Sequence, residues 1–114
     1  MTTSGIAWLP ACELTQLEEG VGRSLRVADR VVALFRCGGE IYALDGMDPV
    51  AGVAVMDSGL VGDCQGEPMV ASPLYKQRYS LRDGRCLDNP ALGLRPWPIK
   101  IEEGQVWLAQ PDLT

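Results

Sequence analysis

Four cysteines, Cys12, Cys37, Cys64 and Cys86, offer the most obvious chemistry in this sequence. Thiolates bind zinc and iron–sulfur clusters, but structural metal sites usually bring their ligands in close pairs such as CxxC. Here each cysteine lies more than twenty residues from the next. The spacing favours four small, semi-buried apolar side chains, kept reduced in a cytosolic setting. A four-cysteine metal site is the alternative.

Histidine is absent from the chain. Imidazole is the commonest metal ligand and the only side chain that titrates near neutral pH without perturbation. Its absence excludes Ser-His-Asp and Cys-His catalysis. Paired carboxylates of the glycosidase type remain formally open, although nothing in the sequence singles out one pair. The residue types therefore point to no catalytic residue in this chain.

The charge balance limits the partners that the protein can bind. Fifteen acidic and ten basic residues give a net charge of −5, which argues against nucleic acid, whose phosphates require Lys and Arg. No apolar run approaches the ~20 residues needed to cross a bilayer. Residues 1–5 lack the features of a signal peptide. We therefore expect a cytoplasmic protein with neither a nucleic-acid nor a membrane partner.

The elements that position these residues are predicted to be short strands. The 114 residues are 46% hydrophobic and fit one domain, with a core at about 6–109 and short flexible termini. Thirteen glycines and eight prolines punctuate the chain, and no segment keeps a helical period over three turns. The class is all-β. Strands are expected at 6–9, 24–28, 31–36, 41–44, 59–62, 69–71, 79–82, 85–87, 97–102 and 105–109, a helical turn at 14–19, and long loops at 45–58, 72–78 and 88–96.

Two of these loops share a pattern. One reads Asp48-Pro49-Val50-Ala51-Gly52, and the other reads Ser72-Pro73-Leu74-Tyr75-Lys76 and is followed by a strand and the turn Asp83-Gly84. The pair resembles the Rieske domain, which holds a [2Fe–2S] cluster through two cysteines and two histidines on loops of pattern C-x-H-x-G and C-x-x-H. The resemblance implies an antiparallel β-sandwich or barrel, with the loops 45–58 and 72–78 apposed in place of a cluster-binding tip.

The cluster ligands themselves are missing from this frame. Asp48 and Ser72 stand at the cysteine positions, and Val50 and Tyr75 stand at the histidine positions. Valine has no donor atom, and serine and tyrosine oxygens are poor partners for sulfur-bridged iron. Because all four positions have changed together, the resemblance implies neither a cluster nor another metal in this chain.

One group within the family is similar in this respect: the small subunit of assimilatory NAD(P)H-dependent nitrite reductase. The resemblance covers about Trp8 to Leu108 and is most specific over 72–76. It implies a cofactor-free accessory role beside a large subunit that carries flavin, sirohaem and an iron–sulfur cluster and reduces nitrite to ammonium in nitrate assimilation. A free-standing module that binds a protein or small ligand is the second hypothesis, and an enzyme or electron carrier in its own right is the third.

Two of the degenerate positions have structural interpretations beside functional ones. Asp48 is expected to brace its own loop through backbone N–H groups, with a functional acid as the alternative. Val50 is expected to fill the space that a missing cluster would leave.

The second loop offers a candidate partner contact made of Tyr75, Lys76 and Arg78. Tyr75 is either packed between the two loops with its hydroxyl bonded, or it is a partner contact or electron relay. Lys76 and Arg78 are either a solvated basic pair or a docking surface for an acidic patch. Trp8, Trp97 and Trp107 are expected in the core or packed on the hairpins.

Overall fold

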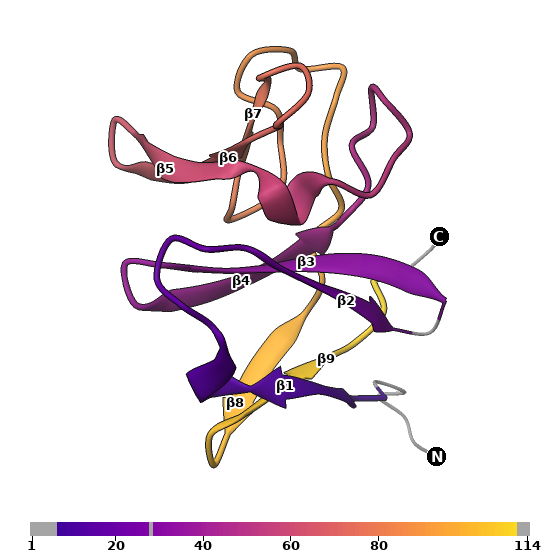
Figure 1. The fold of residues 1–114 in the computed structure, drawn as a ribbon, viewed down its shortest axis with the longest axis vertical. Coiled ribbons are helices and arrows are strands. Elements are labelled where there is room, and N and C mark those ends of the chain that lie inside the picture. The colour runs from indigo at the N-terminus through magenta and orange to yellow at the C-terminus, as the bar shows by residue number, and fades with distance from the viewer. Residues whose placement is uncertain (1–6, 28, 112–114) are drawn as a thin grey trace.

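The computed structural model describes residues 7–27 and 29–111 and shows an all-β molecule (Figure 1). The strands among these residues are β1 (Leu9–Glu13), β2 (Arg23–Val27), β3 (Arg30–Cys37), β4 (Glu40–Asp45), β5 (Leu60–Cys64), β6 (Glu67–Ala71), β7 (Arg78–Ser80), β8 (Ile99–Glu102) and β9 (Gln105–Leu108). Two short 3₁₀ turns interrupt them: η1 (Leu14–Gln16) and η2 (Met56–Ser58). The described residues include no helix long and apolar enough to cross a membrane.

The strands form three antiparallel sheets of three strands, ordered β1-β9-β8, β2-β3-β4 and β5-β6-β7. The sheets follow one another along the longest axis of the molecule, with β2-β3-β4 in the middle (Figure 1). The expected antiparallel class is confirmed. The middle sheet has a neighbour on each side, so its central strand must be apolar on both faces.

Strand β3 meets this requirement. Residues 32–35 are fully buried, and successive side chains of a strand point to opposite faces. Val32 and Leu34 belong to the apolar cluster shared with β1, β8 and β9, whereas Ala33 and Phe35 belong to the cluster shared with β6 and β7. One apolar strand therefore links two cores.

Two connections lie at the end of the molecule formed by β5-β6-β7 (Figure 1). One runs from β4 to η2, and it is anchored where the Met56 N–H donates to the Gly46 carbonyl at 3.1 Å and the Met56 side chain is buried. The other joins β6 to β7. The expected adjacency of the loops 45–58 and 72–78 is confirmed, because their side chains are hydrogen-bonded to each other.

Some expected boundaries were wrong. The first strand is Leu9–Glu13 rather than 6–9, with Ile6 outside the described residues. No strand forms at 85–87, where only isolated bridges occur, Tyr79 with Cys86 and Arg85 with Gly93. Pairing with β7 is confined to the Tyr79–Cys86 bridge, where the Ser80 N–H donates to the Arg85 carbonyl and the Leu87 N–H donates to the Arg78 carbonyl. On its other side the Cys86 N–H donates to the Leu92 carbonyl.

Candidate functional site

The most connected polar group at this end of the molecule is the carboxylate of Asp48, which is fully buried. The Ser72 hydroxyl donates a short hydrogen bond to its Oδ2 atom. The backbone N–H groups of Val50 and Ala51 donate to Oδ1 at 2.8 and 3.2 Å, and Gln77 Nε2 donates to the same oxygen at 3.1 Å. Asp48 therefore braces its own loop, as expected, and also joins that loop to the next.

These contacts determine the charge of Asp48. Burial raises the pKa of the carboxyl group, but the hydrogen bonds from Ser72, Val50, Ala51 and Gln77 outweigh burial, and the net pKa lies below its usual value. A carboxylate that accepts several hydrogen bonds favours its ionised form. Asp48 is thus a structural anion at neutral pH, and a general acid would need the opposite shift.

Gln77 extends the network into the core. Its Nε2 atom also donates to the Tyr79 hydroxyl at 2.9 Å, and Tyr79 is fully buried. Burial raises the pKa of Tyr79, so this hydroxyl stays protonated. The Oε1 atom of Gln77 is buried without a hydrogen-bond partner. Neither residue could be recognised from sequence, because a glutamine between two cations and a tyrosine on a strand give no signal of their own.

Both loops are built on one hydrogen-bond pattern, and we call residues 48–52 and 72–76 the tip loops. In each, the first residue's side-chain oxygen accepts from the N–H two residues on, and its carbonyl accepts from the N–H four residues on. Its own N–H donates to the carbonyl five residues on. The fifth residue is left-handed: φ is +72° at Gly52 and +69° at Lys76.

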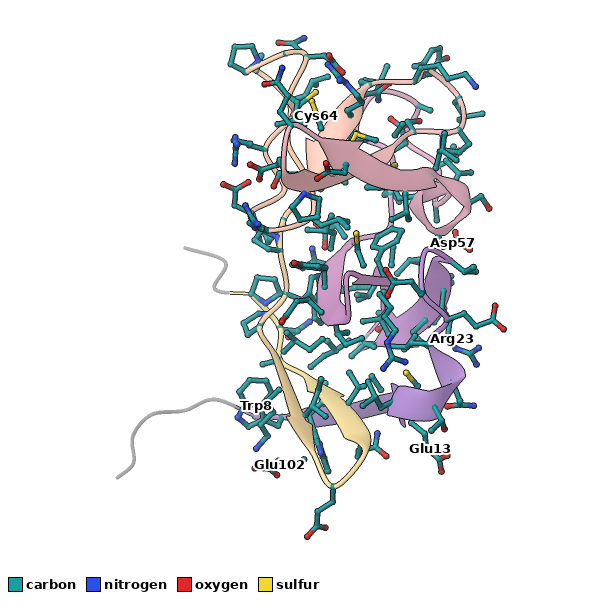
Figure 2. All side chains as sticks on the ribbon, turned by 90° about the vertical axis from the view of Figure 1, so that its left-hand side faces the viewer. Trp8, Glu13, Arg23, Asp57, Cys64 and Glu102 are labelled. Carbon is teal, nitrogen blue, oxygen red and sulfur yellow. The ribbon has the colours of Figure 1, made fainter. Side chains whose placement is uncertain are left out.

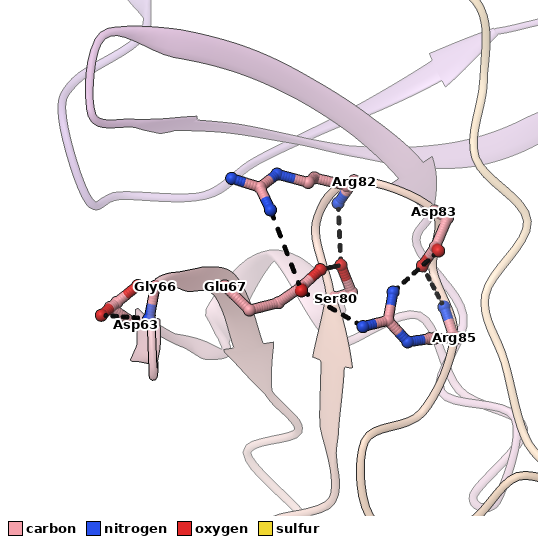
Figure 3. A network of polar contacts seen from close by, with 7 residues as sticks. All are labelled: Asp63, Gly66, Glu67, Ser80, Arg82, Asp83 and Arg85. Atoms are coloured by element: carbon pink, nitrogen blue, oxygen red, sulfur yellow. Dashed lines mark hydrogen bonds and ion pairs between the residues drawn. The ribbon is translucent and has the colours of Figure 1, made fainter.

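The same pattern occurs a third time at residues 80–84, at the end of β7 away from the second tip loop. The Ser80 hydroxyl accepts from the Arg82 N–H, the Ser80 carbonyl accepts from the Gly84 N–H, and φ at Gly84 is +80°. As Ser72 does with Asp48, Ser80 donates its hydroxyl to a carboxylate, that of Glu67, which also pairs with Arg82 and Arg85 (Figure 3). The three loops thus share one frame.

Known proteins are similar to this chain in architecture and in sequence. Residues 7–109 match the model of the Rieske-like [2Fe-2S] domain. The chain belongs to this family.

Three relatives narrow the assignment within the Rieske-like family. The chain is 31% identical to the nitrite reductase (NADH) small subunit of Escherichia coli (strain K12), over 89% of this chain and 95% of that subunit. A structure assigned as an NADH-dependent nitrite reductase small subunit from Mycobacterium tuberculosis aligns with a TM-score of 0.89 and 38% identity, covering 95% of this chain and 98% of the other. The chain thus groups with nitrite reductase small subunits.

The third relative is a much longer protein. The nitrite reductase [NAD(P)H] large subunit of Klebsiella oxytoca is 44% identical over 106 residues, which are 93% of this chain and 11% of that protein. This chain therefore spans about a tenth of the length of that relative.

A Rieske cluster does not fit the four positions that would hold it. The Asp48 carboxylate and the Ser72 hydroxyl are hydrogen-bonded to each other in the interior, and Val50 carries no donor atom. Sulfur-bridged iron is bound by thiolate and imidazole, and none of the four side chains supplies either. Within residues 7–27 and 29–111, no three side chains of Cys, Asp, Glu or His come together as a metal site.

Two expectations for these positions were wrong. Val50 does not fill an internal space, because 49% of its surface is exposed, and the polar side chains of Asp48, Ser72 and Gln77 occupy the interior instead. Tyr75 is not packed between the loops, because it is 61% exposed. Both errors have the same kind of cause: Val50 lies within the tight turn that begins at Asp48 and Tyr75 within the one that begins at Ser72, and both turns leave these side chains exposed.

Lys76 and Arg78, expected as a basic pair, have different surroundings in the structure. Lys76 is exposed at the end of its loop, whereas Arg78 contacts Asp88 at 2.6 Å and donates to Cys64 Sγ at 3.4 Å. Arg78 is therefore already engaged within the chain. It does not form a free cationic pair with Lys76, although its side chain remains partly exposed to solvent.

The cysteines and tryptophans have structural positions. Cys12 and Cys86 are buried, Cys37 and Cys64 are partly buried, and all four are free thiols. Trp97 is buried and donates from Nε1 to Asp45 at 2.7 Å. Lys100 lies over the rings of both Trp8 and Trp107. Trp8 is at the opposite end of the molecule from Cys64 (Figure 2).

Proposed function

We propose that this chain is the cofactor-free small subunit of a cytoplasmic NAD(P)H-dependent nitrite reductase in nitrate assimilation. Its partner is a large subunit, which carries the flavin, sirohaem and iron–sulfur cluster and reduces nitrite to ammonium. The chain itself contributes no catalytic, cofactor-binding or metal-binding residue. Its role is to bind the large subunit and to stabilise it or shape access to it, since cofactors carry the chemistry in such enzymes.

One observation carries the partner assignment. A segment 44% identical to this chain is part of the large-subunit polypeptide of Klebsiella oxytoca. In that relative, a domain of this kind is covalently tethered to the large subunit, which keeps its effective concentration high. A separate chain of the same kind must obtain the same proximity by binding. The Asp48–Ser72 hydrogen bond supports the cofactor-free role, because it joins the loops with side chains that offer iron no thiolate or imidazole.

Co-expression with the large subunit tests the proposal. We expect the two chains to elute as one complex by size-exclusion chromatography. We also expect nitrite-dependent oxidation of NAD(P)H by the large subunit to be slower, or lost faster on storage, when this chain is omitted. A chain that elutes alone, with the large subunit equally active and stable without it, would favour the free-standing binding module instead.

A further inference from the structure

The tip end carries an exposed apolar surface. Large apolar side chains are normally exposed singly, and a group of them marks an interaction site. Among the described residues eight such side chains are exposed, and two of these, Val21 and Ile101, lie before β2 and on β8. The other six, which we call the apolar tip surface, are Met47, Val50, Val53, Leu60, Leu74 and Tyr75.

Three neighbouring segments supply these side chains. The tip loops are joined by the Asp48–Ser72 hydrogen bond, and Leu60 begins β5 opposite Ala71, the last residue before the second loop. A hollow of about 330 Å³ lies between the start of β5 and the second tip loop, lined by Leu60 and Pro73 on its apolar walls and by Lys76. A hollow of this size accepts a bulky side chain of a partner, the usual arrangement for a binding hot spot.

The charge of this surface differs from that of the whole chain. In residues 47–55 and 72–77 the ionisable side chains, tyrosine aside, are Asp48, which is buried, and Lys76, which is exposed. The chain as a whole carries a net charge of −5. The two loop segments of the apolar tip surface therefore present one exposed cation on an otherwise acidic protein, whereas the segment that leads to Leu60 carries the partly buried Asp57. A complementary partner places a carboxylate opposite Lys76.

The surface is also held rigidly. The hydrogen-bond frame of the tip loops fixes the backbone that carries Val50, Leu74 and Tyr75. Lys76 adopts φ +69°, a conformation that is costly for a residue other than glycine and that is often found at functional positions. Preorganised loops lose little conformational entropy when a partner binds.

Three occupants of this surface can be compared by their charge and by their relation to the chain. A second copy would bring Lys76 against Lys76 between two chains of charge −5. A lipid surface attracts clusters of basic residues, and here a single lysine is exposed within residues 47–55 and 72–77. The large subunit is favoured because a domain of this kind is tethered to it in Klebsiella oxytoca.

We propose that the apolar tip surface docks on the large subunit of nitrite reductase, against an apolar face that bears a carboxylate opposite Lys76. This proposal rests on the proposed function. The candidate contact expected from the sequence was Tyr75, Lys76 and Arg78. The surface proposed here omits Arg78, because Arg78 is paired with Asp88, and includes Leu74, Val50 and Leu60.

Affinity measurements with the full chain test this proposal. The double substitution Leu74→Ser and Tyr75→Ser removes two exposed side chains of the surface, and Val21→Ser with Ile101→Ser removes two elsewhere as a matched control. By isothermal titration against the purified large subunit, we expect the first pair to weaken binding about 30-fold or more, as for hot-spot residues. The control pair should change the dissociation constant by less than about 3-fold. Lys76→Glu should also weaken binding, and more so at low salt.

Other results separate the two proposals. If the tip variant melts like the parent and binds the large subunit equally tightly, the docking surface lies elsewhere while the proposed function stands. If the parent itself fails to bind the large subunit, the proposed function fails and this inference fails with it. Self-association of the parent that the tip variant abolishes, or binding to anionic vesicles in place of the large subunit, would assign the surface to a different occupant and overturn the proposal.

Discussion

Replacing Ser72 with alanine tests the idea that the Asp48–Ser72 hydrogen bond holds the tip loops together. The substitution removes the hydroxyl donor from a fully buried carboxylate, which keeps Val50, Ala51 and Gln77 as donors. A hydrogen bond to a charged group contributes about 1.5–3 kcal/mol. The substitution also removes the acceptor for the Leu74 N–H, but this adds little to the loss of stability, because this part of the loop lies at the surface. We therefore expect a loss of about 2–3 kcal/mol in the free energy of unfolding, or roughly 10 °C in melting temperature.

The effect depends on pH with a sign that follows from Asp48. Its folded pKa lies below the usual value, so its contribution to stability is present above the unfolded pKa of about 3.9 and is lost as the pH falls through the folded pKa. Ser72→Ala raises that folded pKa. The stability difference between parent and variant should be largest at neutral pH and should shrink as the pH falls through the folded pKa of the variant toward the lower folded pKa of the parent.

Urea unfolding at pH 7 and pH 3, at constant ionic strength, measures both effects. Ser24→Ala on the exposed edge of β2 is the matched control and should change stability by less than about 0.5 kcal/mol. The reasoning would be refuted by a Ser72→Ala penalty under about 0.5 kcal/mol at pH 7, or by an equal penalty at both pH values.

Three further predictions follow from the tip and its frame. Anaerobically purified protein should lack a visible absorption band, and iron and acid-labile sulfide assays near two per chain would contradict the donor argument. Gly84→Ala should lower the free energy of unfolding by more than about 3 kcal/mol, because the added Cβ would lie 1.8 Å from the Leu94 carbonyl oxygen. As a control in the same urea titration, Gly104→Ala should lower it by only about 1 kcal/mol, because Gly104 is also left-handed but its added Cβ would lie in open space. Lys76→Gly should relieve the strain of the left-handed backbone at this position and stabilise the protein by about 0.5–1 kcal/mol. Calorimetry should then show a melting temperature raised by a few degrees. A lower melting temperature would indicate that the lysine side chain stabilises the loop.

The parts of the fold that could be predicted from sequence are those governed by local pattern. The all-apolar run at 31–35 indicated a strand buried on both faces, and the hairpin near 97–109 followed from alternation. The role of Asp48 as a loop brace also followed, because an aspartate before proline and glycine commonly accepts local backbone hydrogen bonds.

The errors concern side-chain direction and long-range pairing. Val50 and Tyr75 were assigned interior positions by their apolar and aromatic character, but the tight turns of their loops leave them exposed. The pairing of Arg78 with Asp88 joins residues ten apart across a loop, and no local pattern predicts it. Gln77 was overlooked because its role in the hydrogen-bond network arises only in three dimensions, where it lies beside both Asp48 and Tyr79.

The repeated loop frame has a consequence for how this protein is made in the cell. Each of its three copies is closed by backbone groups and one side-chain oxygen that the gene itself encodes. None of these contacts requires a bound metal, so the two tip loops can fold as soon as the chain has been synthesised. Under the proposed cofactor-free role, folding of this protein is independent of iron availability and of cluster-assembly machinery. Under the proposed function, the chain can therefore meet its large subunit already folded.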